Sequence, residues 1–272
     1  ISVTGVQTCA LPISIFVPGS TGDLYARVLG SSLQQVTGQP VVVENVAGAG
    51  GAVASERVSR ATPDGHTLLV TIAGTHVLRG FLTRAVSFDA VADFTPVTTL
   101  VESITYVISS TAVPAGSLRE LIQYARANPG KVAYGSSGIG SPTHLVGETL
   151  KELTGAEIVH VPYKAIAQTL QDTVSGQLQM SFVIGGGVRA AIKTGKVRVI
   201  AVTGDRKDPR MPEVPTLAEV VPGYEPVPNW TGLFAPKGMA PALLARVHAD
   251  VAKSINAPEA RQKLLEIGRA HV

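Results

Sequence analysis

The chain has 272 residues, of which 45% are hydrophobic and 16% are charged, so it is long and apolar enough for two α/β domains and too apolar to be disordered. The formal net charge is +3, but no basic run is longer than Arg206-Lys207 and aromatic residues make up only 5%, so we expect no nucleic-acid partner. No apolar run approaches the roughly 20 residues that span a bilayer.

The two ends of the chain suggest an origin outside the native gene. Residues 7–14 (QTCALPIS) and 266–272 (EIGRAHV) can be encoded by DNA strings that are reverse complements over their shared length, as in a library adaptor read in opposite directions. We expect residues 1–14 and 269–272 to be non-native tails, and the native export signal to be missing with the true N-terminus. Cys9, the only cysteine, then carries no information about the redox compartment.

From residue 15 onward, strands alternate with helices. We predict the end of a buried strand at 15–17, a helix at 24–36, a strand at 39–45, a helix at 52–60 and a strand at 66–72. Alternation at this spacing is typical of a mainly parallel sheet, whose ligands lie outside the carboxyl ends of the strands.

A second series of elements follows a Ser/Pro connection at residues 107–114. We predict helices at 117–127, 143–154, 165–175 and 241–254, and strands at 131–134, 157–161, 178–184 and 201–203. Residues 222–228 form a second Pro-rich crossing. The sequence therefore predicts two α/β parts joined by two crossing segments.

Two loops of small residues each stand between a strand and a helix. Residues 18–23 are PGSTGD, and residues 134–144 are YGSSGIGSPTH. Glycine and serine supply close backbone N–H groups and hydroxyls, and the positive end of the following helix points the same way, so each loop suits an anion. Two such loops, far apart in sequence, indicate one ligand held from two sides. A further Gly-rich turn, residues 47–51, completes no phosphate-binding motif and is explained by tight helix packing.

The order of short motifs along the chain is similar to that of one protein family. The motifs are PGSTGDLYAR (18–27), GQPVVVEN (38–45), PDGHTLL (63–69), GTH (74–76), DFTPV (93–97), YGSSGIGSPTHL (134–145), HVPYK (160–164), PEVPTLAE (212–219) and WTGLFAP (230–236). Together they resemble the Bug-type periplasmic solute-binding proteins, the receptors of tripartite tricarboxylate transporters, over residues 15–268.

This resemblance implies a fold, a function and a location. The fold is α/β, with two Rossmann-like lobes joined by crossing strands in the periplasmic-binding-protein (Venus-flytrap) architecture. Lobe 1 would be residues 15–110 plus 230–268, and lobe 2 residues 111–229. The function would be that of a monomeric periplasmic receptor, without cofactor, metal or catalysis. It would capture a small carboxylate in the interlobe cleft and deliver it to the membrane subunits of the transporter.

The resemblance also implies which residues meet the ligand. The expected set is Ser20, Thr21, Gly22, Asp23, Gly74, Thr75, His76, Tyr134, Ser136, Ser137, Gly138, Gly140, Ser141, His144, Tyr163 and Ile184. For Asp23 the alternative is helix capping. For His76 and His144 the alternative is a buried structural role with satisfied hydrogen bonds.

Two departures from the family pattern concern the ligand. Residues 182–187 are FVIGGG, where relatives commonly place an acidic or amide residue after the phenylalanine, and Ala165-Ile166 replaces a glycine-rich step. Both changes add apolar bulk. They indicate a ligand with an apolar or aromatic body between its polar ends, such as an aromatic dicarboxylate.

The rival function is that of an enzyme. Residues 138–143 (GIGSPT) come close to G-x-G-x-x-G/A after a strand, so an NAD(P)-dependent oxidoreductase using the 134–144 loop is the alternative. The third small residue of that motif is lacking. The acidic residue expected about 20 positions further on would be Glu157, which lies at the start of its predicted strand and not at the end. No G-x-S-x-G motif is present, and the histidines show no close metal-ligand pair.

Overall fold

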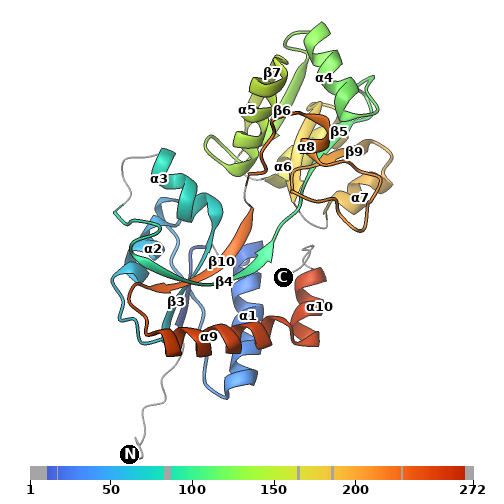
Figure 1. Ribbon diagram of the computed structural model, residues 1–272. Helices are drawn as coiled ribbons and strands as arrows, with labels where there is room; N and C mark the ends of the chain where they lie inside the picture. Colours follow the sequence, from blue (N-terminus) through green and yellow to red (C-terminus); the bar gives the residue numbers. More distant parts are fainter. Residues whose placement is uncertain are drawn as a thin grey trace, which may run out of the picture. The chain divides into compact units, whose positions relative to one another are not determined.

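The structure is a computed structural model that describes residues 11–16, 18–82, 87–163, 166–184, 187–227 and 229–266. It divides into two compact units, which we call unit 1 (Ile1–Glu102 with Trp230–Val272) and unit 2 (Ser103–Asn229). The first boundary falls after Glu102 rather than after residue 110, because the strand Thr105–Ser110 pairs with strands of the second sheet. Figure 1 shows a helix-flanked sheet in each unit.

Unit 1 contains one five-stranded sheet in the order β2-β1-β3-β10-β4. Its strands are β1 (Leu11–Ser14), β2 (Glu44–Asn45), β3 (Thr67–Ile72), β4 (Phe94–Glu102) and β10 (Trp230–Pro236). Its helices are α1 (Thr21–Thr37), η1 (Ala49–Gly51), α2 (Ala52–Ser59), the π-helix η2 (Gly74–Leu78), α3 (Arg79–Leu82), α9 (Pro241–Ile255) and α10 (Pro258–Glu266). β10 runs antiparallel to both of its neighbours.

Unit 2 contains a second sheet in the order β7-β6-β8-β5-β9. Its strands are β5 (Thr105–Ser110), β6 (Val132–Ser136), β7 (Ile158–Pro162), β8 (Met180–Ile184) and β9 (Val197–Val202). Its helices are α4 (Leu118–Ala127), α5 (Pro142–Thr154), α6 (Ile166–Ser175), α7 (Gly187–Lys193) and α8 (Leu217–Val220). β5 is antiparallel to β8 and β9.

The two sheets follow the same plan. In unit 1, the parallel strands β2, β1 and β3 are followed by the antiparallel β10 and then by β4. In unit 2, the parallel strands β7, β6 and β8 are followed by the antiparallel β5 and then by β9. The predicted mainly parallel sheets are therefore confirmed except for β10 and β5, each of which directly follows a crossing between the units. The strand order reverses beside β1 and β3 in unit 1, and beside β6 and β8 in unit 2. Ligands bind at such switch points, at the carboxyl ends of the strands.

Some predicted boundaries differ from the observed ones. The predicted strand at 39–45 reduces to β2, which lies at the edge of the sheet. The first strand ends at Ser14 instead of continuing through 15–17. Of the predicted tails, residues 1–10 and 269–272 lie outside the described residues, whereas Leu11–Ser14 forms β1.

Both sheets are fixed by apolar cores. In unit 1, α1 and α9 pack on one face through residues such as Leu29 and Val251. In unit 2, Leu121, Leu150 and Phe182 belong to one buried cluster. Each fully buried side chain of this kind contributes about 1.5–3 kcal/mol, so the strands hold the loops at their ends in place. Among the described residues, no helix is long and apolar enough to cross a bilayer.

Candidate functional site

The loop before α1 is closed by a buried carboxylate. Ser20 is the N-cap of α1, and its hydroxyl accepts a hydrogen bond from the Asp23 N–H at 3.4 Å. The Asp23 carboxylate accepts hydrogen bonds from the Gly19 N–H (2.8 Å), Arg27 Nε (2.9 Å) and Asn45 Nδ2 (2.8 Å). Burial raises the pKa of Asp23, but these hydrogen bonds outweigh it and the net pKa is lowered. Asp23 therefore braces the loop, and Ser20, not Asp23, caps the helix.

The donors that remain in this loop are backbone amides. The N–H groups of Ser20 and Gly22 have no hydrogen-bond partner among the described residues. They lie at the positive end of a 17-residue helix. A Cβ at Gly22 would come 2.3 Å from the Phe16 ring, so packing requires glycine there. Free amides at a helix N-terminus suit a carboxylate.

The predicted segment Gly74 to His76 lies in η2, directly after β3. Thr75 and His76 are buried, and the His76 side chain is stacked on Phe234 with ring centroids 4.0 Å apart. Neither ring nitrogen of His76 reaches a hydrogen-bond partner among the described residues. Burial lowers the pKa of His76. This geometry holds the ring inside unit 1 among aromatic side chains.

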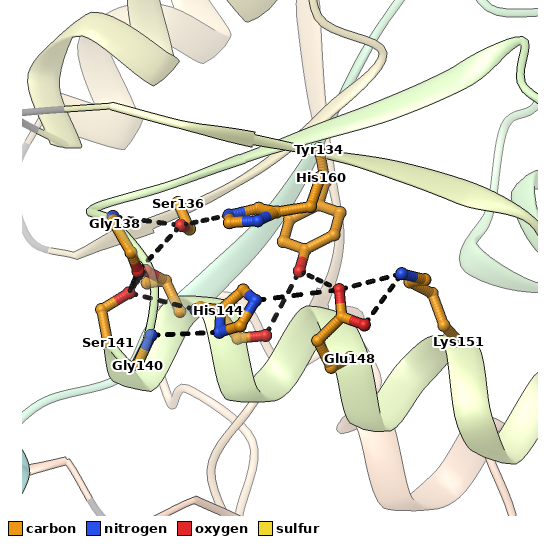
Figure 2. A network of polar contacts seen from close by, with 10 residues as sticks. Tyr134, Ser136, Gly138, Gly140, Ser141, His144, Glu148, Lys151 and His160 are labelled. Atoms are coloured by element: carbon orange, nitrogen blue, oxygen red, sulfur yellow. Dashed lines mark hydrogen bonds and ion pairs between the residues drawn. The ribbon is translucent and has the colours of Figure 1, made fainter. Parts of the chain in front are cut away.

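The loop between β6 and α5 is a tight glycine turn, drawn in Figure 2. Ser141 caps α5: its hydroxyl accepts from the His144 N–H at 3.2 Å and donates to the Gly138 carbonyl at 2.7 Å. Gly138 (φ 108°) and Gly140 (φ 78°) adopt left-handed conformations that favour glycine. The residue between them, Ile139, is 81% exposed.

The sequence predicts that the backbone amides of this loop are open to a ligand. In the structure, most of them donate to acceptors within the loop and the first turn of α5. The bonds run from Ser137 to Thr143 Oγ1 (3.1 Å), from Gly138 to Ser136 Oγ (3.1 Å), from Gly140 to His144 Nδ1 (3.1 Å) and from Ser141 to the Gly138 carbonyl (3.2 Å). In the described part of the chain, the Ile139 N–H has no partner. The loop is thus preformed, and it presents the Ile139 amide, while the hydroxyl of the exposed Ser137 lies 3.2 Å from Thr143 Oγ1.

Tyr134 is fully buried, and its hydroxyl is used inside unit 2. It donates to Glu148 Oε1 at 2.8 Å, and Lys151 Nζ donates to both oxygens of Glu148 at 3.0 and 2.8 Å (Figure 2). Burial and the nearby Glu148 raise the pKa of Tyr134. Burial raises the pKa of Glu148, but the bonds from Lys151 and Tyr134 outweigh it, so that pKa is lowered. The i, i+3 spacing of Glu148 and Lys151 on a predicted helix was the sequence signal for this pair.

His160 is a residue of this site that the sequence analysis did not include. It lies on β7 directly opposite Tyr134 on β6. Its ring is stacked on Tyr134 (centroids 4.9 Å apart) and tilted against His144 (4.3 Å), and its Nε2 lies 2.7 Å from Ser136 Oγ. Burial lowers its pKa, and the neighbouring His144 lowers it further. Only the strand register, which local sequence does not give, places it here.

Two further predicted residues of unit 2 are Tyr163, which directly follows β7, and Ile184, which is the last residue of β8. The Tyr163 hydroxyl donates to Asp172 Oδ2 at 2.5 Å, and burial together with Asp172 raises the pKa of Tyr163 to about 12. Ile184 ends β8 half-buried, whereas Phe182 is fully buried against Tyr134. The two segments that depart from the family pattern are only partly described, because residues 164–165 and 185–186 lie outside the described residues.

Each unit, taken by itself, therefore presents a small-residue loop and a helix N-terminus at the switch point of its sheet. This arrangement can bind an anionic group through backbone amides. Among the described residues, no three His, Cys, Asp or Glu side chains form a group that could hold a metal ion.

Comparison with known proteins gives the same family as the motifs. Residues 25–271 match the family model described as "Tripartite tricarboxylate transporter family receptor". The UPF0065 protein in the tcbD-tcbE intergenic region of Pseudomonas sp. (strain P51) is 37% identical over 259 residues, covering 93% of this chain and 75% of the relative.

Two solved structures from Rhodopseudomonas palustris are also similar. Rpa4515 with adipate has 31% sequence identity and a TM-score of 0.79, and the match covers 96% of this chain and 88% of that one. MatC (Rpa3494) with bound malate has 30% identity and a TM-score of 0.76, with 96% and 89% covered.

Proposed function

The chain belongs to the tripartite tricarboxylate transporter receptor family, and from that premise we propose that it binds a small dicarboxylate and delivers it to the membrane subunits of such a transporter. The resemblance inferred from the motifs is thereby confirmed at the level of the family. In this proposal the chain acts in the periplasm as a binding protein and not as an enzyme. The dicarboxylates adipate and malate, bound to two of its structural relatives, support the ligand class.

The observation that carries this proposal is the pair of amide-bearing loops, one in each unit. The loop of unit 1 offers amides at Ser20 and Gly22, and the loop of unit 2 offers the Ile139 amide beside the exposed Ser137. The Asp23 carboxylate already accepts hydrogen bonds from the Gly19 N–H, Arg27 and Asn45, so it does not compete for the same amides. The proposal places one carboxylate of the ligand at each loop, on opposite sides of a cleft that closes on it.

The body of the proposed ligand is apolar. Ile184 is half-buried at the end of β8, Ile166 is half-buried at the start of α6, and Ile139 is exposed at the tip of the loop. These side chains offer apolar surface and no hydrogen bonds. A dicarboxylate with a hydrocarbon or aromatic middle therefore fits the loops better than one that carries hydroxyl groups.

The enzyme alternative finds less support in the geometry. A dinucleotide-binding turn must leave its glycine amides open to a pyrophosphate, but the Gly138 and Gly140 amides bond to side chains of Ser136 and His144. At the third motif position, Thr143 is buried and accepts a hydrogen bond from the Ser137 N–H.

The test is a calorimetric titration with adipate of two matched serine variants. Ser141 and Ser117 both cap helices of unit 2, with hydroxyl-to-amide distances of 3.2 and 3.3 Å. Ser141→Ala and Ser117→Ala should each cost about 1 kcal/mol of stability, because each removes one N-cap. Only Ser141→Ala should weaken binding, by about tenfold, the equivalent of one net hydrogen bond. Equal weakening in both variants would contradict the proposed role of this loop.

A further inference from the structure

The hydroxyl of Ser136 links a histidine to the backbone of the loop. Ser136 is fully buried, and its hydroxyl bonds within unit 2. Its Oγ accepts the Gly138 N–H at 3.1 Å, lies 3.2 Å from the Gly138 carbonyl oxygen and lies 2.7 Å from His160 Nε2 (Figure 2). The Ser136 side chain therefore links the turn at Gly138 to His160 on β7.

The second half of the turn is fastened through His144. The Gly140 N–H donates to His144 Nδ1 at 3.1 Å, so that nitrogen is unprotonated, and Nε2 faces Glu148 Oε1 at 4.0 Å. The ring of His144 in turn lies against the ring of His160, with centroids 4.3 Å apart. His160 thus touches both attachments of the turn.

We propose that His160 is a positioning residue for the carboxylate-binding loop, an inference that rests on the proposed function. Its Nε2 sets the Ser136 hydroxyl, and its ring, between those of Tyr134 and His144, sets the imidazole that accepts the Gly140 N–H. Together these contacts fix the turn that presents the Ile139 amide. His160 acts through these neighbours and does not itself touch the ligand.

The test combines substitutions with two measurements, amide hydrogen exchange without ligand and calorimetric titration with adipate. His160→Phe keeps a ring to stack on Tyr134 and removes Nε2, whereas His160→Gln keeps a polar group. Ser136→Ala removes the linking hydroxyl. His248→Phe, on the exposed face of α9, is the control.

Loss of one net hydrogen bond should give His160→Phe and Ser136→Ala about tenfold faster exchange of the Gly138 amide and about tenfold weaker adipate binding. The double variant should be no worse than either single one, because both changes break the same link. His160→Gln should recover part of the loss, and His248→Phe should match the wild type.

Three results would overturn the positioning role: wild-type exchange in His160→Phe, losses that add in the double variant, or no recovery in His160→Gln. If His160→Phe does not fold, Ser136→Ala and His160→Gln still decide the matter through the exchange of the Gly138 amide. If the wild-type chain binds no carboxylate, the proposed function fails, and the exchange measurements alone still test the positioning role.

Discussion

Tyr134 and Gly147 are in direct contact, and their contact fixes the ring stack beside the loop. A Cβ added to Gly147 would lie 2.2 Å from Tyr134 Cε2 and Cζ, and Tyr134 is fully buried, so the ring has no room to move aside. A glycine at this point of α5 is therefore required by the neighbouring strand.

We predict that Gly147→Ala lowers the free energy of unfolding by about 1–3 kcal/mol, as overpacking of a core does. Urea denaturation of the purified variant measures this. Gly80→Ala is the matched control, since its Cβ would meet nothing within 4 Å. That control should be neutral or slightly stabilising, by up to about 1 kcal/mol. Equal stability of Gly147→Ala and the wild type would show that the contact is not as close as described.

His76 should make stability depend on pH. Its pKa is lowered by burial, so the unfolded chain binds the proton more readily than the folded chain. The contribution of the neutral His76 ring to the free energy of unfolding is therefore present above the ordinary imidazole pKa of about 6.5. It is lost as the pH falls from there toward the pKa of His76 in the folded chain. His76→Phe keeps an aromatic ring against Phe234 and removes the titration. Urea denaturation at pH 8 and pH 5.5 should show a smaller loss on acidification in the variant than in the wild type, and an identical loss would contradict this.

At the residue scale, the sequence predicted the two loops but not the direction of each side chain. Asp23 turns inward because Asn45, 22 residues away, donates to it. Ser136 turns inward because His160, 24 residues away, is its partner. Such pairings depend on strand register, which local composition does not encode.

At the scale of elements, an ion pair between the buried Asp208 and the exposed Arg210 ties the segment after β9 to β5. Asp208 is fully buried, accepts a hydrogen bond from the Tyr106 hydroxyl and bonds Arg210 Nε at 2.9 Å. Arg210 Nη2 also donates to the Tyr106 oxygen at 2.7 Å. Burial raises the pKa of Asp208, but the bonds from Arg210 and Tyr106 outweigh it and the net pKa is lowered.

We predict that Asp208→Asn costs about 1.5–3 kcal/mol, because it removes the charge-assisted hydrogen bonds that the buried carboxylate accepts from Arg210 and Tyr106. The measurement is equilibrium unfolding in urea. Asp205→Asn, on an exposed residue of the same segment, should change stability by no more than about 0.5 kcal/mol. A loss in Asp208→Asn as small as in this control would mean that the network does not hold the segment.

Long amphipathic helices were predicted well and strand pairing was not. The predicted helices at 52–60 and 241–254 agree with α2 and α9 to within one residue at each end, because their apolar spacing is a local property. β5 and β10 each insert antiparallel between strands that are far away in the chain, so no local sequence pattern predicts their pairing.

At the scale of the whole molecule, the two crossings between the units are bonded to each other. The pairing of β4 with β10 ends at Glu102 and Trp230, and the Ser103 N–H then donates to the Asn229 carbonyl at 2.9 Å. The receptor function proposed above implies that the units close on the ligand. The radius of gyration from small-angle X-ray scattering should then fall when saturating adipate is added, and an unchanged radius would contradict closure.

The most direct test of carboxylate recognition is a thermal-shift screen of the purified chain. The panel holds mono-, di- and tricarboxylates, aliphatic and aromatic, with NAD and NADP. A ligand that binds only the folded state adds about 2.7 kcal/mol of stability at a hundredfold excess over its Kd, which raises the midpoint. We predict a shift with dicarboxylates, larger for adipate and terephthalate than for malate or citrate, and none with the nucleotides. A shift with NAD or NADP alone would contradict the receptor function and favour the oxidoreductase.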